Sequence, residues 1–500
     1  MKRKSAKDVQ ISQHDLSQIE LKTLYRVAED IQGKDSVSYT QEVFFFIPRS
    51  MEINKDTYTK EQFYLSMTNY IRLKTPKVLE DDELGNQRID LIMPQLTSAL
   101  ADASVLDGML EPLLLETRVF GSYINDRIKS LSRDKPDAIP KALGEIHSLI
   151  ERYRAVMDEL HEKISVHHHL VDSFKYVDEF VSHKLEEYLV GLTRHGIDCA
   201  FYMKKEHARR KAMGYMEVLD VADESEREDF MYRMGLFKKY ISEVLYLEVK
   251  RYKREKFFTN IAAIFGAMSA AVVTALLDPN ARTSMSAGFF AGLRDSLPLV
   301  IAFVAVFYAT KDRLKEEFKQ RVFAWLKRWI PDYNFEIYSK KGELIGACTE
   351  VVAFVNSRKV PPDIRKLRLK GRHVSLRSVS LDQGLHYKRT IRVKHDALKG
   401  AFKNAKHLKD ILRFNFSNFH LKLGDAERPQ SFIGHDSKIR EIVMPKVYHI
   451  RMIVRHQISG AHGTRTTYEQ VRVILDKKGI KRIEERPAER DEKASSAEAA

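Results

Sequence analysis

The hydrophobic and polar positions near the N-terminus alternate with the period of a β-strand. Apolar or β-branched side chains occupy every second position of residues 19–27, and a second extended run covers residues 37–47. The segment between them is rich in turn-forming residues, so the two runs predict a β-hairpin. Thr59 and Gln62 then have the spacing of a helix capping box. Residues 1–78 are therefore expected to form a small β-hairpin followed by a helix.

A helical period replaces this alternation after residue 79 and continues, with interruptions, for most of the next 180 residues. Ser225 and Glu228 have the spacing of a further capping box, and no proline follows them before Phe257. Residues 79–256 are therefore expected to form a helical cytoplasmic domain and stalk. Its last helix is predicted to continue unbroken beyond residue 256.

The most apolar part of the chain lies near its middle. Residues 257–277 contain no charged side chain, and a second apolar run reaches a comparable length over residues 290–310. About 20 residues suffice for a helix to span a bilayer. Lysine and arginine are concentrated on the outer flanks of both runs, whereas Arg282 is the one cation of the connection. By the positive-inside rule, the pattern predicts two transmembrane helices in the inner membrane, with both termini in the cytoplasm.

Small residues recur every four positions in the first apolar run, as at Ala262, Gly266 and Ala270. Such ridges allow close packing of helices in lipid, so we expect a homo-oligomer. Residues 311–330 continue the helical period as a membrane-proximal helix. One alternative function is then an oligomeric pore or a transport accessory subunit, with Arg294 and Asp295 facing a shared lumen.

Residues 331–486 return mostly to the period of strands. Two long alternating runs flank residues 459–465, a glycine-containing turn, and predict an antiparallel hairpin. A modest helix is expected around residues 399–414, and residues 487–500 have the composition of a disordered tail. The predicted fold class is an α+β multidomain membrane protein. It combines a mainly helical N-terminal domain with a small β-hairpin, a two-helix transmembrane hairpin with a helical stalk, and a β-rich C-terminal domain.

The net charge of +15 is confined to the last third of the chain. Residues 331–500 contain 35 Lys and Arg against 20 Asp and Glu, whereas the two classes balance in residues 1–330. The excess marks either a solvated strand face or a surface for anionic lipid headgroups. Nucleic acid is the less favoured partner, because no nucleic-acid-binding motif is present. The cations predicted to form this surface are Arg365, Lys366, Arg368, Lys370, Arg372, Lys388, Arg392, Arg451 and Arg455.

A group of histidines and carboxylates in the helical region is the strongest metal candidate. His168 and Asp172 are four positions apart, as are Glu179 and His183, so each pair shares one face of a helix. Imidazole with carboxylate suits zinc or iron, which makes a membrane-bound metal-dependent enzyme an alternative function. A histidine cluster held by structural hydrogen bonds is the simpler interpretation, in which case the chain has no cofactor.

The sequence contains no phosphate-binding loop, dinucleotide fingerprint, nucleophile elbow, HExxH or CxxC motif. Cys199 and Cys348 are far apart in the chain and are expected to be buried thiols. A non-enzymatic role is therefore favoured over an enzymatic one. The leading hypothesis is an inner-membrane scaffold, sensor or recruitment platform with two cytoplasmic domains and an unknown protein partner.

Overall fold

A computed structural model describes most of the chain. The described residues are 9–31, 35–75, 110–131, 138–163, 169–216, 223–252, 331–356, 359–369, 382–394, 407–461 and 463–486, with short pieces between 260 and 322. They belong to two compact units, each described here by itself. The β unit comprises residues 1–69, 248–403 and 410–500, and the helical unit comprises residues 70–247 and 404–409.

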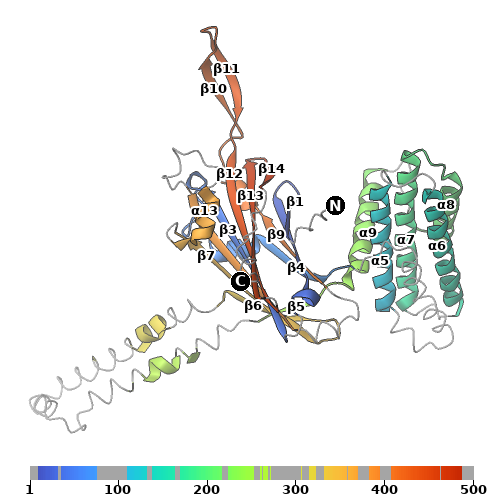
Figure 1. The fold of residues 1–500 in the computed structure, drawn as a ribbon, viewed down its shortest axis with the longest axis horizontal. Helices are drawn as coiled ribbons and strands as arrows, with labels where there is room; N and C mark the ends of the chain where they lie inside the picture. The colour runs from blue at the N-terminus through green and yellow to red at the C-terminus, as the bar shows by residue number, and fades with distance from the viewer. Residues whose placement is uncertain are drawn as a thin grey trace, which may run out of the picture. The chain divides into compact units, whose positions relative to one another are not determined.

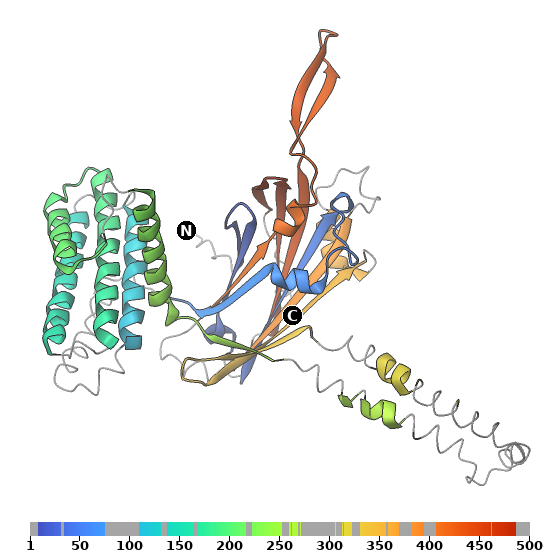
Figure 2. The same ribbon diagram turned by 180° about the vertical axis from the view of Figure 1, so that it is seen from behind.

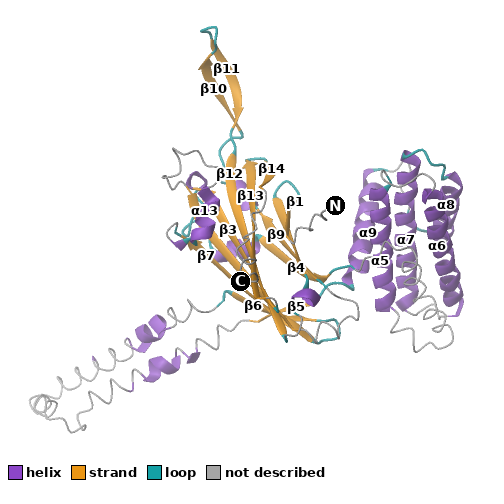
Figure 3. Ribbon diagram, in the orientation of Figure 1, coloured by secondary structure: helices purple, strands orange, loops and turns teal. Residues whose placement is uncertain are grey.

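The β unit is built on an eight-stranded antiparallel sheet, shown in Figures 1 and 3. Its strand order is β14-β13-β12-β3-β8-β7-β6-β5. In chain order the strands are β3 (Ser36–Pro48), β5 (Glu248–Tyr252), β6 (Tyr333–Tyr338), β7 (Leu344–Val355), β8 (Asp382–Lys394), β12 (Tyr448–Gly460), β13 (Gly463–Asp476) and β14 (Gly479–Arg486).

A four-stranded sheet has the order β1-β2-β9-β4. Its strands are β1 (Val9–Gln13), β2 (Gln18–Tyr25), β4 (Met67–Leu73) and β9 (Leu408–Asn415). The main core contains buried side chains from both sheets, because alternate positions of each strand point to the same face. Phe45 of β3, Tyr387 of β8 and Phe414 of β9 belong to this core. Packing of the two sheets places the polar residues described below in the interior.

Short helices complete the β unit: α1 (Val27–Asp30), the 3-10 helix η1 (Arg49–Met51), α2 (Lys60–Leu65), α13 (Pro362–Leu369) and α15 (Ser417–His420). Thr59 and Gln62 form the predicted capping box at the start of α2, which confirms that part of the sequence analysis. Buried Ile364 of α13 packs against Phe44 and Phe46, whose side chains point to the opposite face of β3 from Phe45. The eight-stranded sheet is thus covered on part of its second face.

The helical unit contains α5 (Leu110–Ser130), α6 (Ala138–Lys163), α7 (His169–Arg194), α8 (Ala200–Met213) and α9 (Glu224–Glu243). Helix α7 contacts each of the other four, and Figure 2 shows the bundle from behind. A Cβ atom at Gly121 of α5 would lie 3.1 Å from the Phe180 ring of α7. Glycine therefore permits the close approach of these two helices.

The fold class predicted from the sequence is wrong. No helix among the described residues is long and apolar enough to cross a membrane. Of the predicted spans, residues 257–277 are described only in short pieces and residues 290–310 only at Val306. Part of the predicted membrane-proximal helix and all of the predicted tail also lie outside the described residues. The predicted stalk also fails, because α9 ends at Glu243 and β5 follows it, pairing with β6. Long-range strand pairing here overrides the helical periodicity of the local sequence.

The predicted N-terminal β-hairpin is wrong as well. Strand β2 pairs with β1 in the four-stranded sheet, whereas β3 lies between β12 and β8 in the larger sheet. Residues 67–73 and 408–415 form strands where helices were expected. The hairpin of β12 and β13 around the turn at residues 459–465 is confirmed, with pairing from Tyr448–Leu475 to Gly460–Gly463.

Candidate interaction site

The helical unit holds the residues predicted to bind metal, but it does not group them as ligands. Asp172 is exposed in the first turn of α7, and His168 lies outside the described residues. Both carboxylate oxygens of Glu179 accept hydrogen bonds from Arg233, at 2.8 and 2.7 Å. Nδ1 of His183 lies 3.6 Å from the carboxylate of Glu186. Among the described residues, no three His, Cys, Asp or Glu side chains are placed to hold one ion.

The predicted basic surface is divided between internal ion pairs and exposed side chains. Arg368 is buried, pairs with Asp382 at 3.0 Å and lies over the ring of Phe46. Nη1 of Arg451 donates to the backbone oxygen of Arg368 at 2.8 Å, and both side chains line a small surface hollow.

The other predicted cations of this surface are one paired arginine, four exposed side chains and two residues outside the described part of the chain. Arg455 pairs with Glu42 and with Asp363. The other described cations of the set are exposed, and two lie outside the described residues. The exposed ones are Arg365, Lys366, Lys388 and Arg392, and the two outside are Lys370 and Arg372. Arg365, although exposed, donates to the backbone oxygen of Val360 at 3.1 Å. The structure thus places four of the seven described cations of the predicted set in contacts within the β unit.

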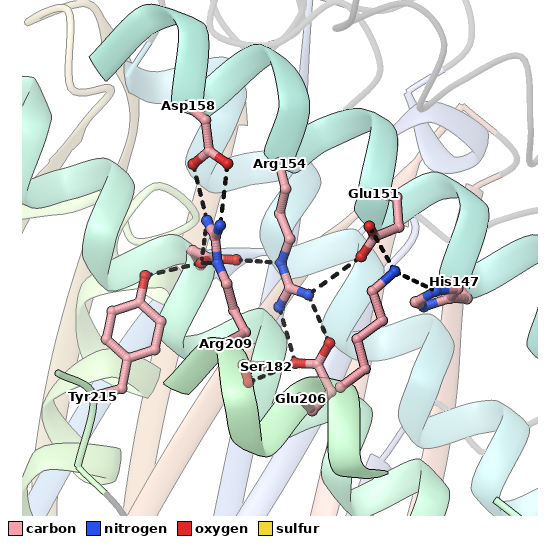
Figure 4. Close-up of polar contacts among 10 residues, drawn as sticks. His147, Glu151, Arg154, Asp158, Ser182, Glu206, Arg209 and Tyr215 are labelled. Carbon is pink, nitrogen blue, oxygen red and sulfur yellow. Dashed lines mark hydrogen bonds and ion pairs between the residues drawn. The ribbon is translucent and has the colours of Figure 1, made fainter. Parts of the chain in front are cut away.

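A buried ion network joins three helices of the helical unit, as Figure 4 shows. Arg154 of α6 donates to Asp178 of α7 at 2.9 Å, and to both oxygens of Glu206 of α8 at 2.6 and 2.9 Å. Ser182 donates to Glu206 at 2.8 Å, and Tyr215 donates to Asp178 at 2.9 Å. The carboxylates raise the pKa of Arg154 even though burial opposes this change. Since both carboxylates are already engaged by protein donors, we assign the network to fixing the helices.

The β unit contains a polar layer, which we define as Glu350, Arg389, Gln41 and His456. These residues are neighbours in register on the adjacent strands β7, β8, β3 and β12, and all four are buried. Burying charged groups is costly unless they are paired. The layer therefore requires partners from the other sheet.

Three residues of the four-stranded sheet contact the polar layer. Asn69 of β4 donates to Glu350 at 2.9 Å, and Gln41 donates to Thr23 of β2 at 2.8 Å. Nη1 of Arg389 lies 3.3 Å from Oδ1 of Asp410 on β9. These contacts cross from one sheet to the other, so the layer fixes how the two sheets align.

Strands β10 (Glu427–Ile433) and β11 (Ile439–Pro445) form a separate two-stranded antiparallel sheet, which we call the ribbon. Its turn is closed by the N–H of Gly434 donating to the oxygen of Lys438 at 2.9 Å, with Ser437 in a left-handed conformation. At its base, the N–H of Lys446 donates to the oxygen of Ala426. Figure 1 shows the ribbon extending beyond the end of β12.

Every residue of both ribbon strands is exposed, although many are apolar. The exposed fraction is 75% for Ile433, 80% for Ile439 and 58% for Val443. Phe432, Ile442 and Met444 are also exposed. Single exposed apolar residues are normal on a protein surface, but a contiguous group marks an interaction site. The ribbon is therefore the candidate functional site of the described chain.

Directly opposed residues of an antiparallel pair point to the same face, so the register assigns each ribbon side chain to one of two faces. We define the acidic face as Glu427, Pro429, Ser431, Ile433, Ile439, Glu441, Val443 and Pro445. The basic face is Arg428, Gln430, Phe432, Arg440, Ile442 and Met444. Each face combines apolar side chains with charges of one sign.

The ribbon was not predicted from the sequence. Its sequence signal is weak, because both faces mix apolar with charged positions and each strand contains a proline, Pro429 or Pro445. A search for strands with one buried face overlooks such a segment, because neither face is buried in the chain itself.

No protein-family model, curated protein or solved structure matches this chain.

Proposed function

We propose that this chain is a non-enzymatic assembly protein whose ribbon docks on a protein partner. The observation that carries the proposal is the complete exposure of a ribbon that presents apolar side chains on both faces. An isolated two-stranded hairpin is at best marginally stable in water, so the ribbon gains order from a partner that covers it.

The chemistry of the ribbon suits a protein surface. Fully burying an Ile or Val side chain contributes about 1.5–3 kcal/mol, so covering Ile433, Ile439 and Val443 supplies a substantial driving force. The outer edges of β10 and β11 also present backbone N–H and C=O groups, since among the described residues each of these strands pairs only with the other. Such edges are used when a partner adds a strand to a sheet.

A paired comparison of full-length proteins tests this function. The double variant I433D/I439D places two charges at the turn end of the acidic face, while S431D adds a charge on that face without removing an apolar group. The complex isolated with wild type or S431D should contain a second polypeptide in stoichiometric amount, whether another copy or a different protein. That polypeptide should be lost from I433D/I439D.

The ribbon variants should keep the fold of both units, because the ribbon side chains are exposed. Circular dichroism and thermal unfolding of the full chain check this point. If I433D/I439D keeps the wild-type complex in composition and mass, the ribbon is not the docking element and the proposed function is wrong.

A further inference from the structure

We infer that the partner of the ribbon is the ribbon of a second copy of this chain, stacked with the acidic face of one copy against the basic face of the next. This inference rests on the proposed function and names the occupant. Its basis is the charge distribution on the two faces, which are complementary to each other within a single ribbon.

The charges decide which faces can meet. Stacking two acidic faces brings Glu427 and Glu441 towards the same residues of the other copy, and stacking two basic faces does the same with Arg428 and Arg440. Juxtaposed like charges cost several kcal/mol at an interface. Stacking opposite faces instead places carboxylates near guanidinium groups, along a strip of apolar side chains on each side. Both faces run along the same pair of strands.

The four charges are available for such contacts. Arg440 forms an ion pair with Asp436 in the turn at 3.1 Å, yet its side chain is 60% exposed. Glu427 lies 4.0 Å from Lys478, and that pair is also exposed. Exposed ion pairs contribute little to stability, so exchanging these partners for those of a second copy costs little.

Stacking of opposite faces determines how many copies can join. A contact between opposite faces is heterologous, so each chain that uses its acidic face leaves its basic face for another copy. Such a contact closes as a ring or continues as an open chain, and it does not stop at a symmetric pair. The inferred assembly therefore contains more than two chains of 58.0 kDa each.

Complementary charge reversals in the full-length protein test the inference. The variant E427R/E441R gives a ribbon with two basic faces, and R428E/R440E gives a ribbon with two acidic faces. Each variant alone should associate at least tenfold more weakly than wild type. An equimolar mixture should regain assembly, with the two variants alternating. K366E/K388E is the matched control, because it changes the net charge as R428E/R440E does at two exposed cations away from the ribbon.

Mass photometry and sedimentation of the purified proteins, alone and mixed, provide the readout. Recovery in the mixture also shows that both variants are folded. The inference is overturned if either reversal alone assembles like wild type, or if the mixture stays dissociated while wild type assembles. A wild-type chain that stays single, but loses a different bound protein when I433D/I439D is introduced, overturns the inference and leaves the proposed function standing. A wild-type chain that stays single and shows no such loss overturns both.

Discussion

Nη1 of Arg389 lies 3.3 Å from Oδ1 of Asp410, across the interface between the eight-stranded and four-stranded sheets of the β unit. Both residues are buried, and Arg389 is also the in-register neighbour of Glu350. One guanidinium thus serves two buried carboxyl groups. The pair joins strands β8 and β9, which belong to different sheets.

Removing this guanidinium should strongly destabilise the β unit. Arg389→Met leaves Asp410 and Glu350 buried without their cation, and breaking a buried ion pair on one side costs about 3–5 kcal/mol. The matched control is Arg392→Met on the same strand, where the side chain is exposed and the expected change is within about 0.5 kcal/mol. Hydrogen exchange of peptides from β8 and β9 measures the difference. Equal effects of the two substitutions would contradict the structural role of the polar layer.

The stability of the β unit should depend on pH through the ionisation of Asp410. Burial raises the pKa of this carboxyl above 3.8, even though Arg389 lowers it. The folded state then binds a proton more tightly than the unfolded state. Its contribution to stability is present at low pH and is lost as the pH rises through the folded-state pKa. The stability of Asp410→Asn relative to wild type should therefore increase with pH, as judged by exchange of β9 peptides at matched pH values. A relative stability that decreases with pH would refute this assignment.

The helical unit should respond to pH in the opposite direction at Glu186. The neighbouring His183 ring, and then the hydrogen-bonded guanidinium of Arg210, lower the pKa of Glu186 to about 2. Stability from this group is fully present above pH 4.5 and is lost as the pH falls towards 2. Glu186→Gln should therefore destabilise α7 and α8 near neutral pH, by an amount that shrinks in acid. Glu187→Gln, at an exposed pair with Lys184, serves as the control. A difference between variant and wild type that is constant with pH would be inconsistent with the prediction.

Neither cysteine should react in the folded chain. Both are free and buried, which confirms the expectation from the sequence. Burial raises the pKa of the Cys348 thiol to about 12, and it raises that of Cys199 as well. Because the thiolate is the reactive species, alkylation by iodoacetamide at pH 8 should be at least about 100-fold slower than in the unfolded chain. Ser431→Cys on the ribbon should react at the rate of a free thiol once dilution has dissociated the assembly. The sulfur of Cys348 accepts a hydrogen bond from Nε of Arg389 at 3.3 Å, so rapid modification of this cysteine in the native chain would show that the polar layer is open to solvent.

The sequence predicted elements whose signals are local. The hairpin of β12 and β13 shows clear alternation around a glycine-containing turn, and the capping box at Thr59 depends on two residues three positions apart. The capping box of α9 was misplaced by two residues, because Asp223 and Glu226 have the same spacing as Ser225 and Glu228. Local chemistry thus identified the helix start without fixing its exact position.

The larger sheet could not be predicted in this way. Strand β3 pairs with β12 and β8, which lie more than 300 residues away along the chain, and no local pattern specifies that choice. In β9, buried Asp410 interrupts the apolar alternation of Leu408, Leu412 and Phe414. The spacing of Leu408, Ile411 and Leu412 then imitates a helix. Asp410, the partner of Arg389 in the polar layer, therefore concealed the strand to which it belongs.

The candidate site was hidden from sequence analysis for a different reason. The predicted metal ligands and basic surface were chosen by residue type. In the structure, however, Glu179 accepts hydrogen bonds from Arg233, and Arg368 forms an ion pair with Asp382. The ribbon has no distinctive residue type. Its importance follows from the exposure of ordinary apolar side chains, which only a structure reveals.

Hydrogen exchange of residues 427–445 in the full-length protein shows whether the ribbon is covered in the assembly. Amides of the ribbon should exchange slowly in the assembled protein and rapidly after dilution, because an uncovered two-stranded ribbon opens readily. I433D/I439D should exchange rapidly at every concentration, while peptides from β12 and β13 stay as protected as in wild type. Equal exchange of the ribbon in wild type and variant, at every concentration, would contradict the account.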